Sequence, residues 1–297
     1  MASASKSTTV RFYRAFFRLG EAVAPRLAAR AATRLWFTLP APTARPDAPA
    51  GAAEFAVTSQ GATVRGSYWG DGPVVYLVHG WGGSGAQLGA YVEPLVQRGY
   101  RVVSFDSPSH GVSDPGPSGR RSSTGVEFAK ALDAVAARFG PAHAVIAHSM
   151  GAISTLLTLK CGWLATGRLV LLAPLTGFSL QLRTVQRALA IGPRTHRQVE
   201  RLAHRRVGVA IEDLDLETLF ADVDTVPTLV VHDRDDRQTS FSASQRLAAS
   251  VPDASFIATR GLGHQRLLRD PKLTSTVVGF VDGDAVTPNA GSATMAV

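Results

Sequence analysis

Ala144-Val145-Ile146-Ala147-His148-Ser149-Met150-Gly151-Ala152 carries one serine at the junction between a strand-like run and a helix-like run. Residues 144–148 are small or β-branched apolar residues up to the histidine, which favours a buried strand. Residues 150–162 predict a helix. Only small side chains such as Ala147 and Gly151 fit beside so sharp a strand-to-helix corner. A serine in this position is more often a helix N-cap than a nucleophile, so the surrounding sequence decides.

Short apolar runs alternate with helical segments on both sides of this stretch. Strands are expected at 55–59, 62–69, 74–79, 101–106, 144–148, 168–173, 228–232 and 254–259. Helices are expected at about 84–98, 122–139, 150–162, 241–250 and 265–281. Several of the strands are continuous Val, Ile and Leu runs, as in parallel strands covered on both faces. The alternation predicts an α/β fold with a doubly wound, mostly parallel sheet.

The chain of 297 residues fits one large α/β domain that carries additions. Residues 1–50 are expected to form a helical arm and a proline-rich linker, and residues 51–282 the main domain. The connection at about 175–226 is too long for a simple loop and holds helical patterns, so it predicts an inserted helical cap. Residues 283–297 are small and polar and predict a disordered tail.

Three further segments with chemistry-bearing residues follow predicted strands. The segment His79-Gly80-Trp81-Gly82-Gly83 begins at the last residue of the strand at 74–79. Asp233-Arg234-Asp235-Asp236-Arg237 follows the strand at 228–232, and Gly261-Leu262-Gly263-His264 follows the last one. Any one of these would read as an ordinary turn. Their occurrence in one order along the chain makes the combination specific.

Together these segments resemble the α/β-hydrolase family over roughly residues 54–282. The serine corner is similar to the family's G-x-S-x-G nucleophile elbow, with Ala147 in place of the first glycine. The segment from His79 resembles the H-G-x-G oxyanion loop. The aspartate cluster resembles h-G-x-x-D, with Asp233 in place of glycine, and the last segment resembles G-x-G-H. Residues 106–113 resemble the family's D-x-P-x-x-G-x-S turn, which is architectural.

The resemblance implies a triad of Ser149 as nucleophile, His264 as base and Asp236 as acid, in the chain order expected for this fold. The backbone N–H groups of Trp81 and Met150 would form the oxyanion hole.

Asp235 stays open as the triad acid, because three aspartates fall within four positions. No cofactor and no metal are expected, since the single cysteine excludes a cysteine-rich zinc site and the histidines lack compact ligand spacing. Cys161 is expected to be a packed thiol at the end of a buried helix.

The implied activity is that of a serine hydrolase, carboxylesterase-like or lipase-like, which cleaves a small-molecule ester or related acyl bond through an acyl-enzyme. A thioesterase, a carbon–carbon bond hydrolase and a cofactor-free perhydrolase share the implied triad and stay open. The alternative from another class is a catalytically silent relative that binds a ligand or partner.

Charge separates the arm from the rest of the chain. Eight basic and two acidic residues give residues 1–50 a net charge of +6, out of +8 for the whole chain. The main domain is therefore nearly neutral, which argues against nucleic acid as a partner. Helical spacing in residues 10–37 predicts an apolar stripe opposite arginines, with a break at Pro25. The stripe consists of Tyr13, Phe16, Phe17, Gly20, Ala24, Leu27, Ala31 and Leu35.

Three interpretations of the arm stay open. It packs as a helix pair with its arginines solvated, or it lies on an anionic membrane as an interfacial helix. In a eukaryotic source it would also fit an organelle transit peptide. Neither a transmembrane helix nor a cleaved secretory signal is expected, so the expected location is cytoplasmic, with peripheral membrane contact under the second interpretation.

Overall fold

The computed structural model describes the backbone of residues 2–41 and 47–285, and the side chains from residue 9 on. This part contains an eight-stranded sheet with the order β1-β2-β4-β3-β5-β6-β7-β8. β2 pairs antiparallel with β1 and with β4, and all other neighbours are parallel. The predicted α/β fold with a mostly parallel sheet is confirmed. The strands are β1 (Ala53–Ser59), β2 (Ala62–Trp69), β3 (Val74–Val78), β4 (Arg101–Phe105), β5 (Ala142–His148), β6 (Leu169–Leu172), β7 (Thr228–Asp233) and β8 (Ala254–Thr259).

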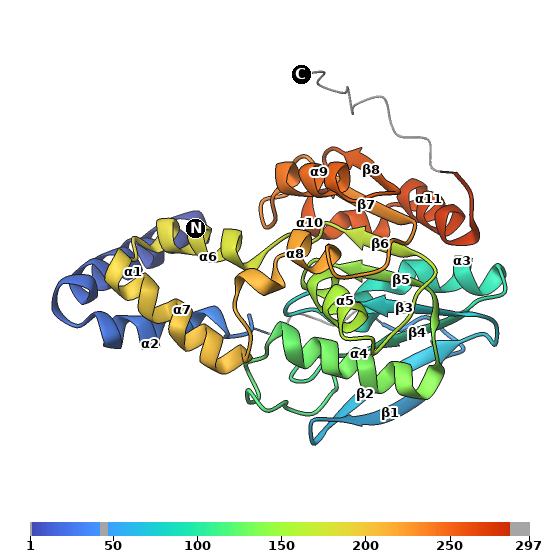
Figure 1. Cartoon of the computed structure of the whole chain (residues 1–297), viewed down its shortest axis with the longest axis horizontal. Coiled ribbons are helices and arrows are strands. Elements are labelled where there is room, and N and C mark those ends of the chain that lie inside the picture. The colour runs from blue at the N-terminus through green and yellow to red at the C-terminus, as the bar shows by residue number, and fades with distance from the viewer. Residues whose placement is uncertain (1, 42–46, 286–297) are drawn as a thin grey trace. The chain divides into compact units, whose positions relative to one another are not determined.

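Two groups of helices cover the faces of this sheet (Figure 1). One group packs together from the short helix η1 (Gly85–Tyr91), α3 (Val92–Gln97), α10 (Gly263–Arg266), η3 (Leu267–Arg269) and α11 (Pro271–Asp282). The other consists of α4 (Gly125–Phe139), α5 (Met150–Lys160), α8 (Leu216–Phe220) and α9 (Phe241–Ser250). Coverage on both faces explains why the central strands β3 and β6 are apolar at every position.

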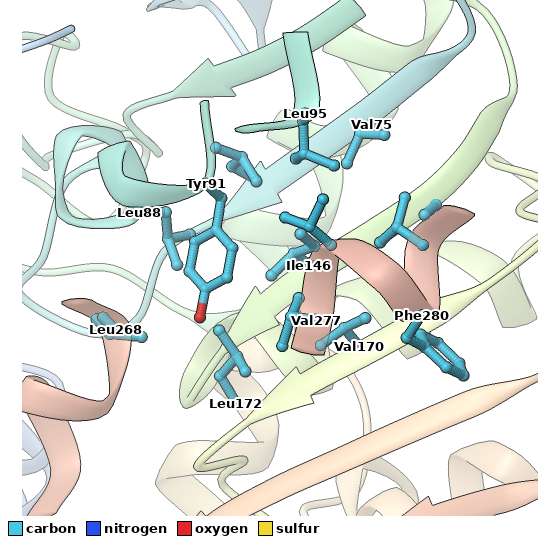
Figure 2. Close-up of a cluster of buried hydrophobic side chains, with 14 of the residues drawn as sticks. Val75, Leu88, Tyr91, Leu95, Ile146, Val170, Leu172, Leu268, Val277 and Phe280 are labelled. Atoms are coloured by element: carbon cyan, nitrogen blue, oxygen red, sulfur yellow. The ribbon is translucent and has the colours of Figure 1, made fainter. Parts of the chain in front are cut away.

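A hydrophobic core fills the space between the sheet and the first group of helices (Figure 2). Val75, Ile146 and Val170 project from three neighbouring strands and meet Leu88 of η1 and Val277 of α11. All five side chains are completely buried. This packing fixes the parallel strands in register, and with them the loops at their carboxyl ends.

The chain divides into two compact units. The sheet unit consists of residues 39–176 and of the chain from residue 216 on. The helical unit combines the chain up to Thr38 with Gly177–Asp215. Its helices are α1 (Ala2–Val23), α2 (Pro25–Trp36), α6 (Phe178–Leu189), α7 (Pro193–Val207) and the short η2 (Glu212–Leu214). The insertion after β6 therefore contributes its first helices to one unit and α8 to the other.

Within the helical unit, the arm packs against the inserted helices α6 and α7. Pro25 begins α2, so the predicted break in the arm is confirmed. The Glu21 side chain of α1 caps the start of α7, where its carboxylate oxygens accept from the backbone N–H groups of Arg194 and Thr195 at 2.9 Å each. Segments far apart in the sequence thus build one helical unit.

The face with which the arm packs differs from the predicted stripe. Phe17 is buried, but Phe16, Leu27 and Leu35 of the stripe are exposed. The buried face of α2 consists of Ala28, Ala29, Ala32 and Thr33. Small side chains let α2 approach its neighbours closely, and the larger apolar residues are left outside.

Cys161 also differs from its prediction, because it caps the end of α5 and is exposed. The helix ends one residue before it, and the cysteine lies in the turn that follows.

Among the described residues, no helix combines the length and hydropathy that a membrane span requires. The predicted tail lies outside the described residues from position 286 on, and so do residues 42–46 of the predicted linker.

Candidate active site

Ser149 occupies a strained corner between β5 and α5. Its backbone φ of 51° and ψ of −115° lie in a region that non-glycine residues rarely adopt. The corner is held from both sides, because the Ser149 N–H donates to the Leu172 carbonyl and the Ser149 carbonyl accepts from Ala152 and Leu175. Such strain, fixed by the surrounding backbone, is typical of functional sites.

The loop after β3 lies directly against this corner. A Cβ atom on Gly80 would come within 3.0 Å of the Ser149 Cβ, and one on Gly151 within 2.6 Å of the Val78 carbonyl oxygen. The close approach of backbone therefore requires glycine at position 151 and leaves little room for a larger side chain at position 80. Trp81 follows Gly80 and Met150 follows Ser149, so the two residues predicted to supply the oxyanion hole lie on the two segments that meet here.

His264 and Asp236 are brought together at the ends of β8 and β7. The imidazole Nδ1 lies 2.7 Å from the Asp236 Oδ2. Both side chains are buried, at 5% and 0% exposure. An ionised carboxylate only accepts hydrogen bonds, so the proton in this contact is assigned to Nδ1 of the ring.

Two further side chains hold Asp236, and the sequence pattern gave them no role. Thr239 Oγ1 donates to Asp236 Oδ2 at 2.9 Å, and His232 Nε2 lies 3.2 Å from the same oxygen. His232 Nδ1 lies 2.7 Å from Ser244 Oγ, which fixes the ring from its other side. The available signal was the position of His232 at the end of β7, four residues before the aspartate.

The pKa of Asp236 reflects these contacts. Burial raises it, but hydrogen bonds from His232 and His264 outweigh burial and hold the pKa well below the usual range of an aspartate. The carboxylate is therefore ionised at neutral pH, as an acceptor for a protonated imidazole nitrogen must be.

The other two aspartates of the cluster have different environments. The exposed Asp235 accepts from the Gly261 N–H at 2.9 Å. The buried Asp233 accepts from Thr259 Oγ1 and from the Leu262 N–H. Of the three aspartates, Asp236 is the one whose carboxylate contacts the His264 ring.

His148, the residue before Ser149, contacts His264. The His148 ring lies 4.7 Å from the His264 ring between centroids, and its Nε2 lies 3.1 Å from the His264 carbonyl oxygen. Burial, aided by the nearby His264, lowers the pKa of His148 to about 3, so this ring is neutral. None of the hydrogen bonds in the described chain joins the Ser149 hydroxyl to the His264 ring directly. Such bonds are often long without substrate and tighten when it binds.

The turn after β4 braces the loop after β3. The buried Asp106 carboxylate accepts from the Gly85 and Val112 N–H groups at 2.8 and 2.9 Å. His79 Nε2 accepts from the Ser107 N–H at 3.0 Å. His79 and Asp106 therefore hold the backbone of the loop after β3 and of the turn after β4 in place.

A cavity of about 790 Å³ opens beside the Asp236 turn and the His264 loop. Arg234, Arg237 and Arg266 contribute to its lining. Ser149 does not line it, so the cavity does not contain the corner. In the described part of the chain, no group of three His, Cys, Asp or Glu side chains is arranged to hold a metal ion.

Comparison with known proteins places these features in context. A model described as the alpha/beta hydrolase family matches residues 75–276. Among solved structures, the thioesterase domain from the curacin biosynthetic pathway is 18% identical with a TM-score of 0.57, and the match covers 78% of this chain and 99% of that one. An esterase from Exiguobacterium antarcticum is 18% identical with a TM-score of 0.58, over 76% and 98% of the two chains. A meta-cleavage product hydrolase from Pseudomonas fluorescens IP01 is 17% identical with a TM-score of 0.55, over 77% and 97%. None of the curated protein sequences matches significantly.

Proposed function

Because the chain belongs to the alpha/beta hydrolase family, we propose that it is a serine hydrolase that cleaves a carboxylic ester or related acyl bond through an acyl-enzyme on Ser149. The observation that carries the proposal is the buried 2.7 Å contact between His264 and Asp236. This contact lies at the carboxyl ends of the parallel strands, where Ser149 occupies its strained corner after β5. Proteins of similar fold include an esterase, and small-molecule esters are the proposed substrates.

In the proposed mechanism, His264 Nε2 takes the proton from the Ser149 hydroxyl as the oxygen attacks the acyl carbon. Asp236 keeps the proton on Nδ1 and stabilises the imidazolium that forms. The N–H groups of Trp81 and Met150 bind the oxyanion, and each such donor contributes about 3 kcal/mol to transition-state stabilisation. His264 then protonates the leaving group, which departs from the acyl carbon. Water next attacks the acyl-enzyme and gives a proton to His264, the bond between the acyl carbon and Ser149 Oγ breaks, and His264 returns the proton to Ser149 as the carboxylic acid leaves. No cofactor or metal takes part in this scheme.

The test compares Ser149→Ala with Ser242→Ala, which removes an exposed serine hydroxyl from α9. We expect Ser149→Ala to lose at least about 10⁴-fold in kcat/KM on acyl esters and to escape labelling by a fluorophosphonate. Ser242→Ala should keep both. Activity or labelling that survives in Ser149→Ala would exclude Ser149 as the nucleophile.

The substrate panel separates the remaining candidates of the same fold. It contains acyl esters of graded length, matched thioesters, a vinylogous diketone and a peracid-forming assay with hydrogen peroxide. Turnover highest on esters supports the proposal, and a clear preference for another class assigns the thioesterase, carbon–carbon hydrolase or perhydrolase function instead. A wild-type protein that folds and neither turns over any substrate nor reacts with the fluorophosphonate would be a silent binding relative.

A further inference from the structure

We propose that α1 and α2 form a surface that binds an anionic lipid bilayer. Where the structure describes side chains, strongly exposed large apolar residues concentrate on these two helices, and Val112 is the exception elsewhere. The exposed apolar residues of the two helices are Val10, Phe12, Phe16, Leu19, Val23, Leu27 and Leu35. Exposed apolar residues gathered in one place mark an interaction site, whereas single ones do not.

Four of these residues form a stripe along α1. Phe12, Phe16, Leu19 and Val23 recur at spacings of four, three and four, which puts them on one side of the helix. Their exposed fractions are 67%, 42%, 66% and 74%. Phe17, which packs inward, is exposed by only 1%. The helix therefore has a separate buried face, and the stripe is additional to what packing within the helical unit requires.

The exposed charges that α1 and α2 themselves place beside these apolar residues are positive. Arg11 and Arg18 flank the stripe on α1, and α2 carries exposed arginines at 26, 30 and 34 next to Leu27 and Leu35. Glu21 is the single acidic residue between positions 9 and 41. Its carboxylate is turned onto the start of α7, where it accepts two backbone N–H groups. No carboxylate of these two helices therefore offsets the arginines on the outside.

A cavity of about 790 Å³ lies between α2 and α7 on the flank of this surface. Four arginines and two glutamates contribute to its lining: Arg26, Arg30, Arg201, Arg205, Glu200 and Glu212. Guanidinium groups bind phosphate through paired hydrogen bonds. The cavity offers a place for a lipid phosphate group beside the apolar residues that would enter the acyl region.

The combination favours a bilayer over other partners. A second copy that docked stripe to stripe would bring like-charged arginines together. A nucleic acid would use the arginines, but it offers no counterpart for Leu19, Val23 and Leu27. An amphipathic helix with arginines beside Phe and Leu is the pattern that binds the interface of anionic membranes.

The test measures sedimentation of the full-length protein with extruded vesicles of phosphatidylcholine alone and of phosphatidylcholine mixed with phosphatidylglycerol. We expect binding to the mixed vesicles, with affinity that falls as salt rises. The pair Phe12→Ser with Leu19→Ser should weaken binding by about tenfold or more, because both side chains leave water on binding. Val112→Ser, which also removes an exposed apolar residue, should have no effect. Retained circular dichroism and thermal unfolding show that each variant folds.

A second set of variants tests charge separately from apolar contact. Arg26→Gln, Arg30→Gln and Arg34→Gln together should weaken binding to the mixed vesicles on the order of 100-fold. The control removes the same charge from exposed positions of the sheet unit, with Arg120→Gln, Arg246→Gln and Arg260→Gln. The proposal is overturned if the wild-type protein binds neither vesicle type or if both triple variants lose binding equally. It is also overturned if the protein forms a dimer that the Phe12 and Leu19 changes dissociate while vesicles are not bound.

Discussion

Replacement of Asp236 by asparagine tests the proposed triad at its most constrained member. In the wild-type protein, Oδ2 accepts from His264 and Thr239 and also contacts His232, and Oδ1 accepts from two backbone N–H groups. Asparagine keeps one oxygen, which can still accept the backbone N–H groups. Its amide nitrogen then faces the His264 Nδ1 and can only donate to it.

The expected magnitude follows from this geometry. An amide that donates to Nδ1 forces the imidazole proton onto Nε2, which can then no longer accept the proton of Ser149. A tautomer error of this kind costs about 10⁴-fold in kcat, or about 5 kcal/mol. The loss should appear in kcat with little change in KM, because the Asp236 side chain is completely buried.

The assay is hydrolysis of the best ester from the substrate panel, with Asp235→Asn as the matched control. Asp235 is the neighbouring aspartate, is exposed, and its carboxylate bonds the Gly261 N–H. The Asp235→Asn substitution should therefore change kcat by less than about tenfold. If Asp235→Asn caused the large loss and Asp236→Asn the small one, the assignment of the acid would be refuted.

Three further outcomes concern stability. Burial lowers the pKa of His110 from 6.5 to about 3, so below pH 6.5 the unfolded chain binds a proton that the folded chain does not. The free energy of unfolding, measured with urea, should therefore fall from pH 6.5 toward pH 3 in the wild-type protein. The fall should be shallower in His110→Asn. Equal dependence on pH in the two proteins would contradict a lowered pKa of His110. Glu21→Gln removes the charge that caps α7 and should cost about 1 kcal/mol, against no change for the exposed Glu54→Gln, as followed by thermal unfolding. Leu88→Ala opens the core of Figure 2 and should cost about 2 to 5 kcal/mol in urea unfolding, while the exposed Val112→Ala stays within about 0.5 kcal/mol.

The sheet could be predicted from the sequence because several of its strands are continuous apolar runs and because strands alternate with helical segments. The expected strand at 228–232 matches β7 (Thr228–Asp233), and the one at 254–259 coincides with β8. The prediction was less accurate where one expected helix contains the start of a second helix. The expected helix at 265–281 is interrupted before α11, where Asp270 accepts from the Leu273 N–H as an N-cap and Pro271 begins the helix. That Asp-Pro pair was a usable start signal.

The residues of the candidate site could be predicted from the sequence because each of them follows a predicted strand. Parallel strands end at one edge, so order along the chain was enough to bring His264 to the aspartate cluster. The choice between Asp235 and Asp236 depends on which carboxylate contacts the ring, and spacing alone does not fix that. The support from His232 and Ser244 depends on a contact between a strand and the following helix, which leaves no periodic trace in the sequence.

The arm was the least readable part. Helical spacing showed that one face was apolar, but not that alanines would pack and that phenylalanine and leucine would remain outside. Its packing partners are α6 and α7, which lie far away in the sequence, and long-range pairing of this kind has no local signal.

This pairing has a consequence for how the chain is made. Glu21 and Arg194, which meet at the start of α7, are separated by 173 residues. At about 5 to 20 residues per second, a ribosome needs roughly 10 to 35 seconds to synthesise the interval. During that time the partner helices of the arm, α6 and α7, are not yet complete. The arm is therefore synthesised well before its native neighbours, and it can pack against α7 only after that helix has been made.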